Sequence, residues 1–119
     1  MRKIILVEDD PAIREFLVIF LESENYAVSS FSTVTGFLNR NQNDIPDLYL
    51  FDVMLPDGSG INLCKDIKSS TSNIGIPVII MSAHAHLHQM KNLCDPDDFI
   101  SKPFDIDMML DRIKLAIPV

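Results

Sequence analysis

The chain is poor in several residue types on which common protein classes depend. It has 2 cysteines in 119 residues, Cys64 and Cys94, and no CxxC pair, which indicates reduced, buried thiols in a cytoplasmic protein. Basic residues are also few, and the formal charge of -7 argues against direct nucleic acid binding by this domain. No apolar run is long enough to cross a bilayer, and the basic start is followed by only four apolar residues. Neither a membrane segment nor a signal peptide is therefore expected.

What is present is typical of one globular domain over residues 1–119. Apolar residues make up 47% of the chain and are spread evenly, and the length suffices for a single core. Apolar runs of strand type lie at about 3–7, 27–31, 47–51, 78–81 and 99–101. Segments with helical periodicity lie between and after them, at about 11–21, 32–40, 59–69, 85–93 and 106–117, and the fourth has the weakest pattern.

The alternation of strands and helices predicts how the chain is wound. Strands that alternate with helices are parallel and joined by right-handed crossovers, with helices on both faces of the sheet. The runs Ile4–Val7 and Val78–Met81 are apolar throughout, as expected for strands buried on both faces. The sequence therefore predicts an α/β fold with a single doubly wound sheet of five parallel strands and five helices.

Polar side chains follow the carboxyl ends of several predicted strands. They are Glu8, Asp9 and Asp10 after the first, Asp52 after the third, Ser82 after the fourth and Lys102 after the fifth. Ligands of doubly wound sheets bind beyond these strand ends, where the winding reverses. Crowded carboxylates repel one another unless a cation is bound or one group is protonated. We therefore predict a site for a hard cation in which one carboxylate acts as a nucleophile, with Asp10 serving instead as a helix N-cap.

These residues stand in motifs that resemble the receiver domain of two-component response regulators. The motifs are Val7-Glu8-Asp9-Asp10-Pro11, Phe51-Asp52-Val53-Met54-Leu55-Pro56-Asp57-Gly58, Met81-Ser82-Ala83 and Lys102-Pro103-Phe104. The resemblance covers essentially the whole chain and implies a flavodoxin-like fold with strand order 2-1-3-4-5. It also implies phosphorelay signal transduction by a switch that catalyses its own phosphorylation and dephosphorylation without being a turnover enzyme. The donor would be a phosphohistidine of a sensor histidine kinase or a phosphotransfer protein.

The resemblance assigns a role to each residue at the strand ends. Asp52 would accept the phosphoryl group, Ser82 would be the switch hydroxyl and Lys102 the phosphate partner. The ligands of Mg²⁺ would be Glu8, Asp9, Asp52 and the backbone carbonyl of Met54. This is consistent with the preference of Mg²⁺ for oxygen ligands and with its use against charge repulsion in phosphoryl transfer.

The resemblance also predicts an output surface. Phe99 matches a position where the family carries a rotating aromatic side chain, and its movement would remodel the face made by the fourth helix, the fifth strand and the last helix. A homodimer through that face is expected. The segment between Ser82 and Lys102 is shorter than the resemblance implies, so the fourth helix, at about 85–93, is predicted to be short or distorted.

The same residues also bear on other functions. A flavin or nucleotide carrier needs a Gly- or Ser/Thr-rich loop after the first strand, where this chain has acids. A phosphohydrolase with Asp52 as nucleophile needs a second acid at position 54, which is Met. The serious alternative is a receiver-like protein-interaction module that works without phosphorylation. His84 and His88 have the spacing of a metal pair on a helix, but a solvated loop is favoured there because no further ligand completes a site.

Overall fold

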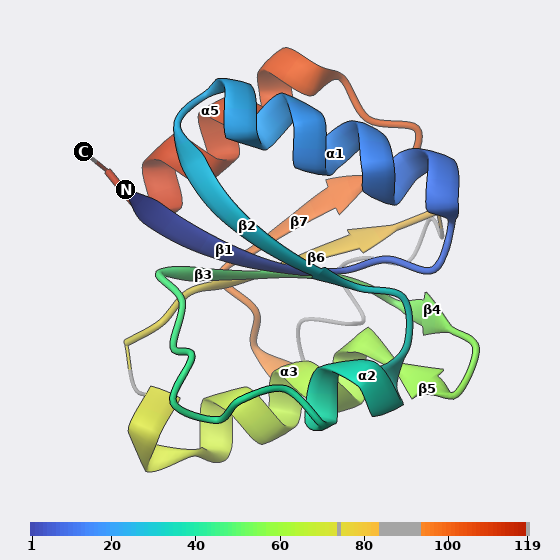
Figure 1. The fold of residues 1–119 in the computed structure, drawn as a ribbon, viewed down its shortest axis with the longest axis vertical. Coiled ribbons are helices and arrows are strands. Elements are labelled where there is room, and N and C mark those ends of the chain that lie inside the picture. The colour runs from blue at the N-terminus through green and yellow to red at the C-terminus, as the bar shows by residue number, and fades with distance from the viewer. Residues whose placement is uncertain (74, 84–93, 119) are drawn as a thin grey trace.

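The computed structural model describes residues 1–73, 75–83 and 94–118 (Figure 1). Five parallel strands form the main sheet: β1 (Arg2–Val7), β2 (Tyr26–Phe31), β3 (Leu48–Asp52), β6 (Val78–Ser82) and β7 (Asp98–Ser101). Their order in space is β2-β1-β3-β6-β7. Since β6 and β7 are the fourth and fifth strands of this sheet, the predicted order 2-1-3-4-5 is confirmed.

Helices cover both faces of the sheet (Figure 1). The helices α1 (Pro11–Ser23) and α5 (Ile106–Ala116) lie on one face, and α2 (Val34–Leu38) and α3 (Gly60–Ser69) on the other. The described residues thus contain four α-helices where five were predicted, because the fourth, at about 85–93, lies outside them. The second helix is shorter than its predicted span at both ends. It begins after Thr33, which is its N-cap and accepts a hydrogen bond from the Gly36 N–H at 2.9 Å, and it ends before Asn39, its C-cap.

The core lies in two layers because side chains alternate across each strand. Residues of β1 show this directly, since Ile4 and Leu6 pack under α1 and α5 while Ile5 and Val7 pack under α2 and α3. All four are fully buried, as predicted for a strand covered on both faces. Because its apolar side chains are buried on both sides, β1 is held firmly in the core, and it thereby fixes the position of the acids at residues 8–10 that follow it.

A small antiparallel hairpin, which the sequence analysis did not predict, follows β3 directly. Its strands are β4 (Met54–Leu55) and β5 (Gly58–Ser59), joined by Pro56 and Asp57. Strands of two residues are too short to show a hydrophobic period, so the pattern indicated only a turn. The hairpin lies at the carboxyl edge of the main sheet (Figure 1).

The two cysteines and the lengths of the helices bear on expectations from composition. Cys64 and Cys94 are free and buried, as predicted, and the Cys64 thiol donates a hydrogen bond to the Cys94 carbonyl at 3.4 Å. Among the residues that the structure describes, no helix is both long enough and apolar enough to cross a membrane.

Candidate functional site

The register of the parallel strands brings the predicted site residues to one edge of the sheet. Val7 pairs with Phe51, so Glu8 follows β1 at the level of Asp52. Asp52 pairs with Met81, so Ser82 lies one residue beyond that level on β6. The strand ends therefore gather side chains that are distant in sequence, as expected for parallel strands in a doubly wound sheet.

Three carboxylates form a compact group at this edge. Ligand oxygens of Glu8, Asp9 and Asp52 all lie within 4.8 Å of one another. Glu8 is fully buried and Asp52 is 7% exposed, whereas Asp9 lies at the surface. Two buried acids so close together require positive charge nearby or a proton on one of them.

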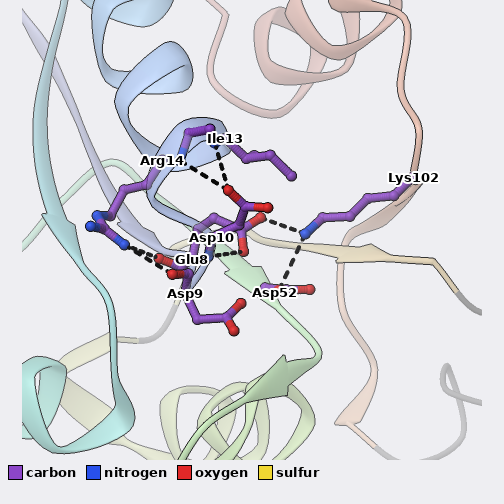
Figure 2. Close-up of polar contacts among 8 residues, drawn as sticks. Glu8, Asp9, Asp10, Ile13, Arg14, Asp52 and Lys102 are labelled. Atoms are coloured by element: carbon purple, nitrogen blue, oxygen red, sulfur yellow. Dashed lines mark hydrogen bonds and ion pairs between the residues drawn. The ribbon is translucent and has the colours of Figure 1, made fainter.

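Lys102 supplies part of that charge (Figure 2). Its ammonium donates a hydrogen bond to Glu8 Oε1 and lies 3.2 Å from Asp52 Oδ2. The Lys102 backbone N–H donates to the Ser82 carbonyl at 2.8 Å, and the Lys102–Pro103 peptide bond is cis. Burial alone would lower the pKa of the Lys102 amine, but the hydrogen bond and charge of Glu8, together with Asp52, raise it above its ordinary value. Lys102 is therefore charged at neutral pH.

The ionisation of Glu8 is finely balanced. Burial raises its pKa from an ordinary 4.5 to about 7; the hydrogen bond from Lys102 opposes this rise, and the neighbouring Asp52 adds to it. Without a cation, the folded domain therefore favours the protonated carboxyl more than an exposed glutamate would. A cation bound to the acids would favour its ionised form.

Asp10 and Arg14 organise the loop that carries the acids (Figure 2). Asp10 is the N-cap of α1, as predicted, because its Oδ1 accepts hydrogen bonds from the N–H groups of Ala12 at 2.9 Å and Ile13 at 3.2 Å. The Arg14 guanidinium donates to the backbone carbonyls of Glu8 at 2.9 Å and Asp9 at 3.3 Å. The sequence analysis missed Arg14, although an arginine one turn into a helix that begins beside an acidic loop is a usable signal.

A cavity of about 200 Å³ opens beside the acids. Its lining residues are Asp9, Asp52, Val53, Met54, Ser82, Ala83 and Lys102. Ser82 is 1% exposed, whereas the Met54 side chain is 62% exposed, at the start of the β4–β5 hairpin. A hydroxyl, an ammonium and two carboxylates therefore line the cavity.

Phe99 lies apart from this cavity. It is on β7 and is half-buried against the core cluster under α2 and α3. Among the described residues it does not line the cavity. Two described elements connect Phe99 to the site: β7 itself, which is followed directly by Lys102, and β6, whose Ile80 pairs with Phe99.

Gly60 is a second residue that the sequence analysis missed. A Cβ atom at this position would lie 2.1 Å from the Asp52 carbonyl oxygen, and the Gly60 N–H donates to the Val53 carbonyl at 3.0 Å. Only glycine allows the start of α3 to approach Asp52 so closely. Its place in the first turn of the helix predicted at about 59–69 was a signal, because glycine is a poor helix former, but its partner was not visible in the sequence.

The donor set of the site fits Mg²⁺. The three grouped side chains offer only carboxylate oxygens, which hard cations prefer, and the cavity adjoins them. The binding role of each residue stays a prediction.

Comparisons with known proteins agree with this geometry. The sequence model of the family described as "Response regulator receiver domain" matches residues 4–114. The chain is similar to the response regulator ArlR of Staphylococcus epidermidis, with 33% identity over 119 residues that cover 98% of this chain and 53% of ArlR. It is also similar to the KDP operon transcriptional regulatory protein KdpE of Escherichia coli, with 34% identity over 119 residues that cover 98% of this chain and 52% of KdpE.

A solved structure resembles the fold closely. The BeF3-activated receiver domain of DrrB, a Thermotoga maritima OmpR/PhoB homologue, has 29% identity and a TM-score of 0.86, covering 100% of this chain and 99% of that domain. The chain spans about half the length of the curated relatives it matches. The match over residues 4–114, on this sheet order, shows that the chain belongs to the response regulator receiver domain family, the phosphorelay signalling module of two-component systems.

Proposed function

We propose that Asp52 accepts a phosphoryl group from a phosphohistidine in a Mg²⁺-dependent reaction. The observation that carries this proposal is the position of Asp52. It ends β3, is 7% exposed, lines the cavity and lies 3.2 Å from the Lys102 ammonium. Residues 1–119 act in this proposal as one receiver domain in the cytoplasm, a switch rather than a turnover enzyme. The donor is a sensor histidine kinase or a histidine phosphotransfer protein.

The proposed transfer is a single displacement at phosphorus. A carboxylate oxygen of Asp52 attacks in line with the bond between phosphorus and the donor imidazole nitrogen. The new O–P bond forms as the P–N bond breaks, and the imidazole leaves with the electron pair and takes up a proton. The product is an acyl phosphate on Asp52.

The acids provide the place for a cation. Glu8, Asp9, Asp52 and the Met54 backbone carbonyl would hold Mg²⁺. When bound, Mg²⁺ supplies positive charge that offsets the repulsion between the carboxylate nucleophile and the anionic donor. Glu8 must then be ionised, which its hydrogen bond from Lys102 already favours.

Ser82 and Lys102 would report the new phosphoryl group. Lys102 stays charged at neutral pH and lies beside Asp52, so it can pair with a phosphoryl oxygen, and the Ser82 hydroxyl can donate a hydrogen bond to another. Their movement would shift β6, and with it the packing of Phe99. The modification acts by favouring one of two populated states.

The proposed output surface includes β7 and α5. We place there the face for homodimer formation, because the α5 side chains Met108 and Leu115 are 47% and 78% exposed. The domain itself makes no direct nucleic acid contact in this proposal. An interaction module that works without phosphorylation is not favoured by any observation, since the residues needed for phosphorylation are all present at the site.

Phosphorylation by acetyl phosphate tests this proposal. Intact mass spectrometry of the wild-type chain should show one added phosphoryl group in the presence of Mg²⁺ and none in EDTA. The Asp52→Asn variant should not be modified, and the control Asp47→Asn, at the opposite edge of the sheet, should behave as wild type. Modification of Asp52→Asn to the wild-type extent would place the acceptor elsewhere.

A further inference from the structure

The side chain of Asp57 makes an unexpected set of contacts. Asp57 lies at the turn of the β4–β5 hairpin and is exposed, yet its carboxylate accepts three hydrogen bonds from the start of α2. The donors are the Val34 N–H at 2.7 Å, the Thr35 N–H at 2.9 Å and the Thr35 hydroxyl at 2.5 Å. The hairpin and α2 lie side by side (Figure 1). An exposed carboxylate with this many partners fixes the hairpin against the helix.

These contacts satisfy groups that α2 leaves open. The first N–H groups of a helix have no partner within the helix. Among these groups, the side chain of the N-cap residue Thr33 accepts a hydrogen bond only from the Gly36 N–H. Asp57, which lies on the hairpin, provides the acceptors for the N–H groups of Val34 and Thr35. The hydrogen bond from the Thr35 hydroxyl and those from the backbone N–H groups also lower the pKa of Asp57, so the contact persists at neutral pH.

Packing at the same place is tight. A Cβ atom on Gly58 would lie 2.9 Å from Val34 Cγ2, so the hairpin backbone lies directly on the first turn of α2. Polar and apolar contacts therefore hold the tip of the hairpin at one position.

The base of the hairpin is held separately. The Val53 N–H donates to the Met81 carbonyl at 3.1 Å, and the Gly60 N–H donates to the Val53 carbonyl at 3.0 Å. Met54 lies between the base and the tip, and it lines the cavity together with Asp52. Its position relative to the acids thus depends on both attachments.

We propose that Asp57 is a positioning residue for the phosphorylation site: by holding the β4–β5 hairpin against α2, it fixes the Met54 backbone for cation binding. This inference rests on the proposed function, because it assumes that the Met54 carbonyl contributes to the Mg²⁺ site. The three hydrogen bonds to the Asp57 carboxylate come from the start of α2 and not from the acidic loop. Asp57 acts through the geometry of the hairpin.

A purely structural cap of α2 would have a different signature. Loss of such a cap lowers the stability of the domain but leaves the affinity of the folded domain for Mg²⁺ unchanged. A positioning role changes that affinity, while the rate of phosphorylation at saturating Mg²⁺ stays near wild type. The two roles are therefore separated by the Mg²⁺ dependence and not by stability.

The test is a Mg²⁺ titration of the whole chain by isothermal calorimetry, paired with acetyl phosphate kinetics at increasing Mg²⁺. Asp57→Ala should weaken Mg²⁺ binding about 3- to 10-fold and raise the half-saturating Mg²⁺ concentration to match. Thr35→Val, which removes one of the three donors, should weaken binding about 2-fold. Asp57→Asn retains acceptor oxygen and should recover part of the loss.

Asp47→Ala is the matched control. Asp47 also accepts hydrogen bonds with a carboxylate that is only partly buried, from the Lys3 N–H at 2.7 Å and from Arg2 at 3.3 Å, but at the opposite edge of the sheet. It should leave Mg²⁺ affinity unchanged. The positioning role would be overturned, and the proposed function kept, if the wild type binds Mg²⁺ and the three variants bind it with equal affinity. These variants are Asp47→Ala, Asp57→Ala and Thr35→Val. Absence of Mg²⁺ binding by the wild type would overturn the proposed function as well. If Asp57→Ala does not fold, Thr35→Val decides the question by the same comparison.

Discussion

At the scale of single residues, the site is governed by the charge balance around Glu8. This side chain is fully buried, lies next to Asp52 and accepts a hydrogen bond from Lys102. Lys102 thus offsets negative charge that a cation would otherwise have to offset. The same acids that suit Mg²⁺ are costly to the fold when no cation is bound, because buried like charges repel.

This balance predicts how stability depends on pH without Mg²⁺. The pKa of Glu8 is raised from 4.5 to about 7, so the folded state holds a proton that the unfolded state releases between these values. The contribution of Glu8 is fully present below about pH 4.5 and is lost as the pH rises through 7, at up to about 1.4 kcal/mol per pH unit.

The variant Glu8→Gln should lack this dependence. Urea unfolding at several pH values between 4.5 and 8, in EDTA, should show that Glu8→Gln gains stability relative to wild type as the pH rises. A constant difference between the two proteins across that range would show that Glu8 ionises at its ordinary pKa in the folded state.

At the scale of elements, the β4–β5 hairpin and the start of α3 place Asp52. Gly60 is the residue that permits this arrangement, since a Cβ atom there would lie 2.1 Å from the Asp52 carbonyl oxygen. Backbone atoms cannot move aside as the end of a flexible side chain can. A side chain at position 60 must therefore displace either α3 or the end of β3.

Gly60→Ala should destabilise the domain by about 3 kcal/mol and slow phosphorylation of the fraction that remains folded. Denaturant unfolding and acetyl phosphate kinetics measure the two effects. Gly36→Ala is the control, because a Cβ atom there would meet side-chain atoms and no backbone: the Thr33 hydroxyl at 3.1 Å and Phe31 Cδ1 at 3.8 Å. Similar small effects for both variants would show that the contact at Gly60 relaxes without cost to the site.

The elements also show how far sequence alone reaches. The five strands and α1 were predictable, because their apolar runs, the cap Asp10 and the helical stripe are local signals. The gathering of Glu8, Asp52, Ser82 and Lys102 followed from parallel topology. Asp57, Gly60 and Arg14 were missed because their roles depend on partners in other elements or on backbone groups, as the contact between Asp57 and Val34 across 23 positions shows. The β4–β5 hairpin was missed because its strands have no period.

At the scale of the whole molecule, the proposed switch connects the site to the β7–α5 surface, formed by Asp98–Ser101 and Ile106–Ala116. This surface has a mixed character. Arg112 pairs with Asp98 at 2.6 Å, while Met108 and Leu115 on α5 are largely exposed. Such a mixture of polar and apolar groups suits a protein–protein contact that forms in the phosphorylated state and is absent in the unphosphorylated state.

Phosphorylation is therefore expected to promote a homodimer through this surface. Sedimentation of the domain with Mg²⁺ and beryllofluoride should show more dimer than without them, and Leu115→Lys should abolish the increase by placing charge in the interface. Ile19→Lys, which changes an exposed apolar residue on α1, is the control. A dimer that responds to Ile19→Lys and not to Leu115→Lys would place the interface elsewhere.

The central claim is that Asp52 carries the phosphoryl group, and chemical trapping tests it most directly. Acyl phosphates are reduced by borohydride, which converts a phosphorylated aspartate to homoserine. After phosphorylation in Mg²⁺, reduction and peptide mass spectrometry, homoserine should be found at position 52 and at no other aspartate. Homoserine at Asp9, Asp57 or any other position, with Asp52 unchanged, would contradict the account.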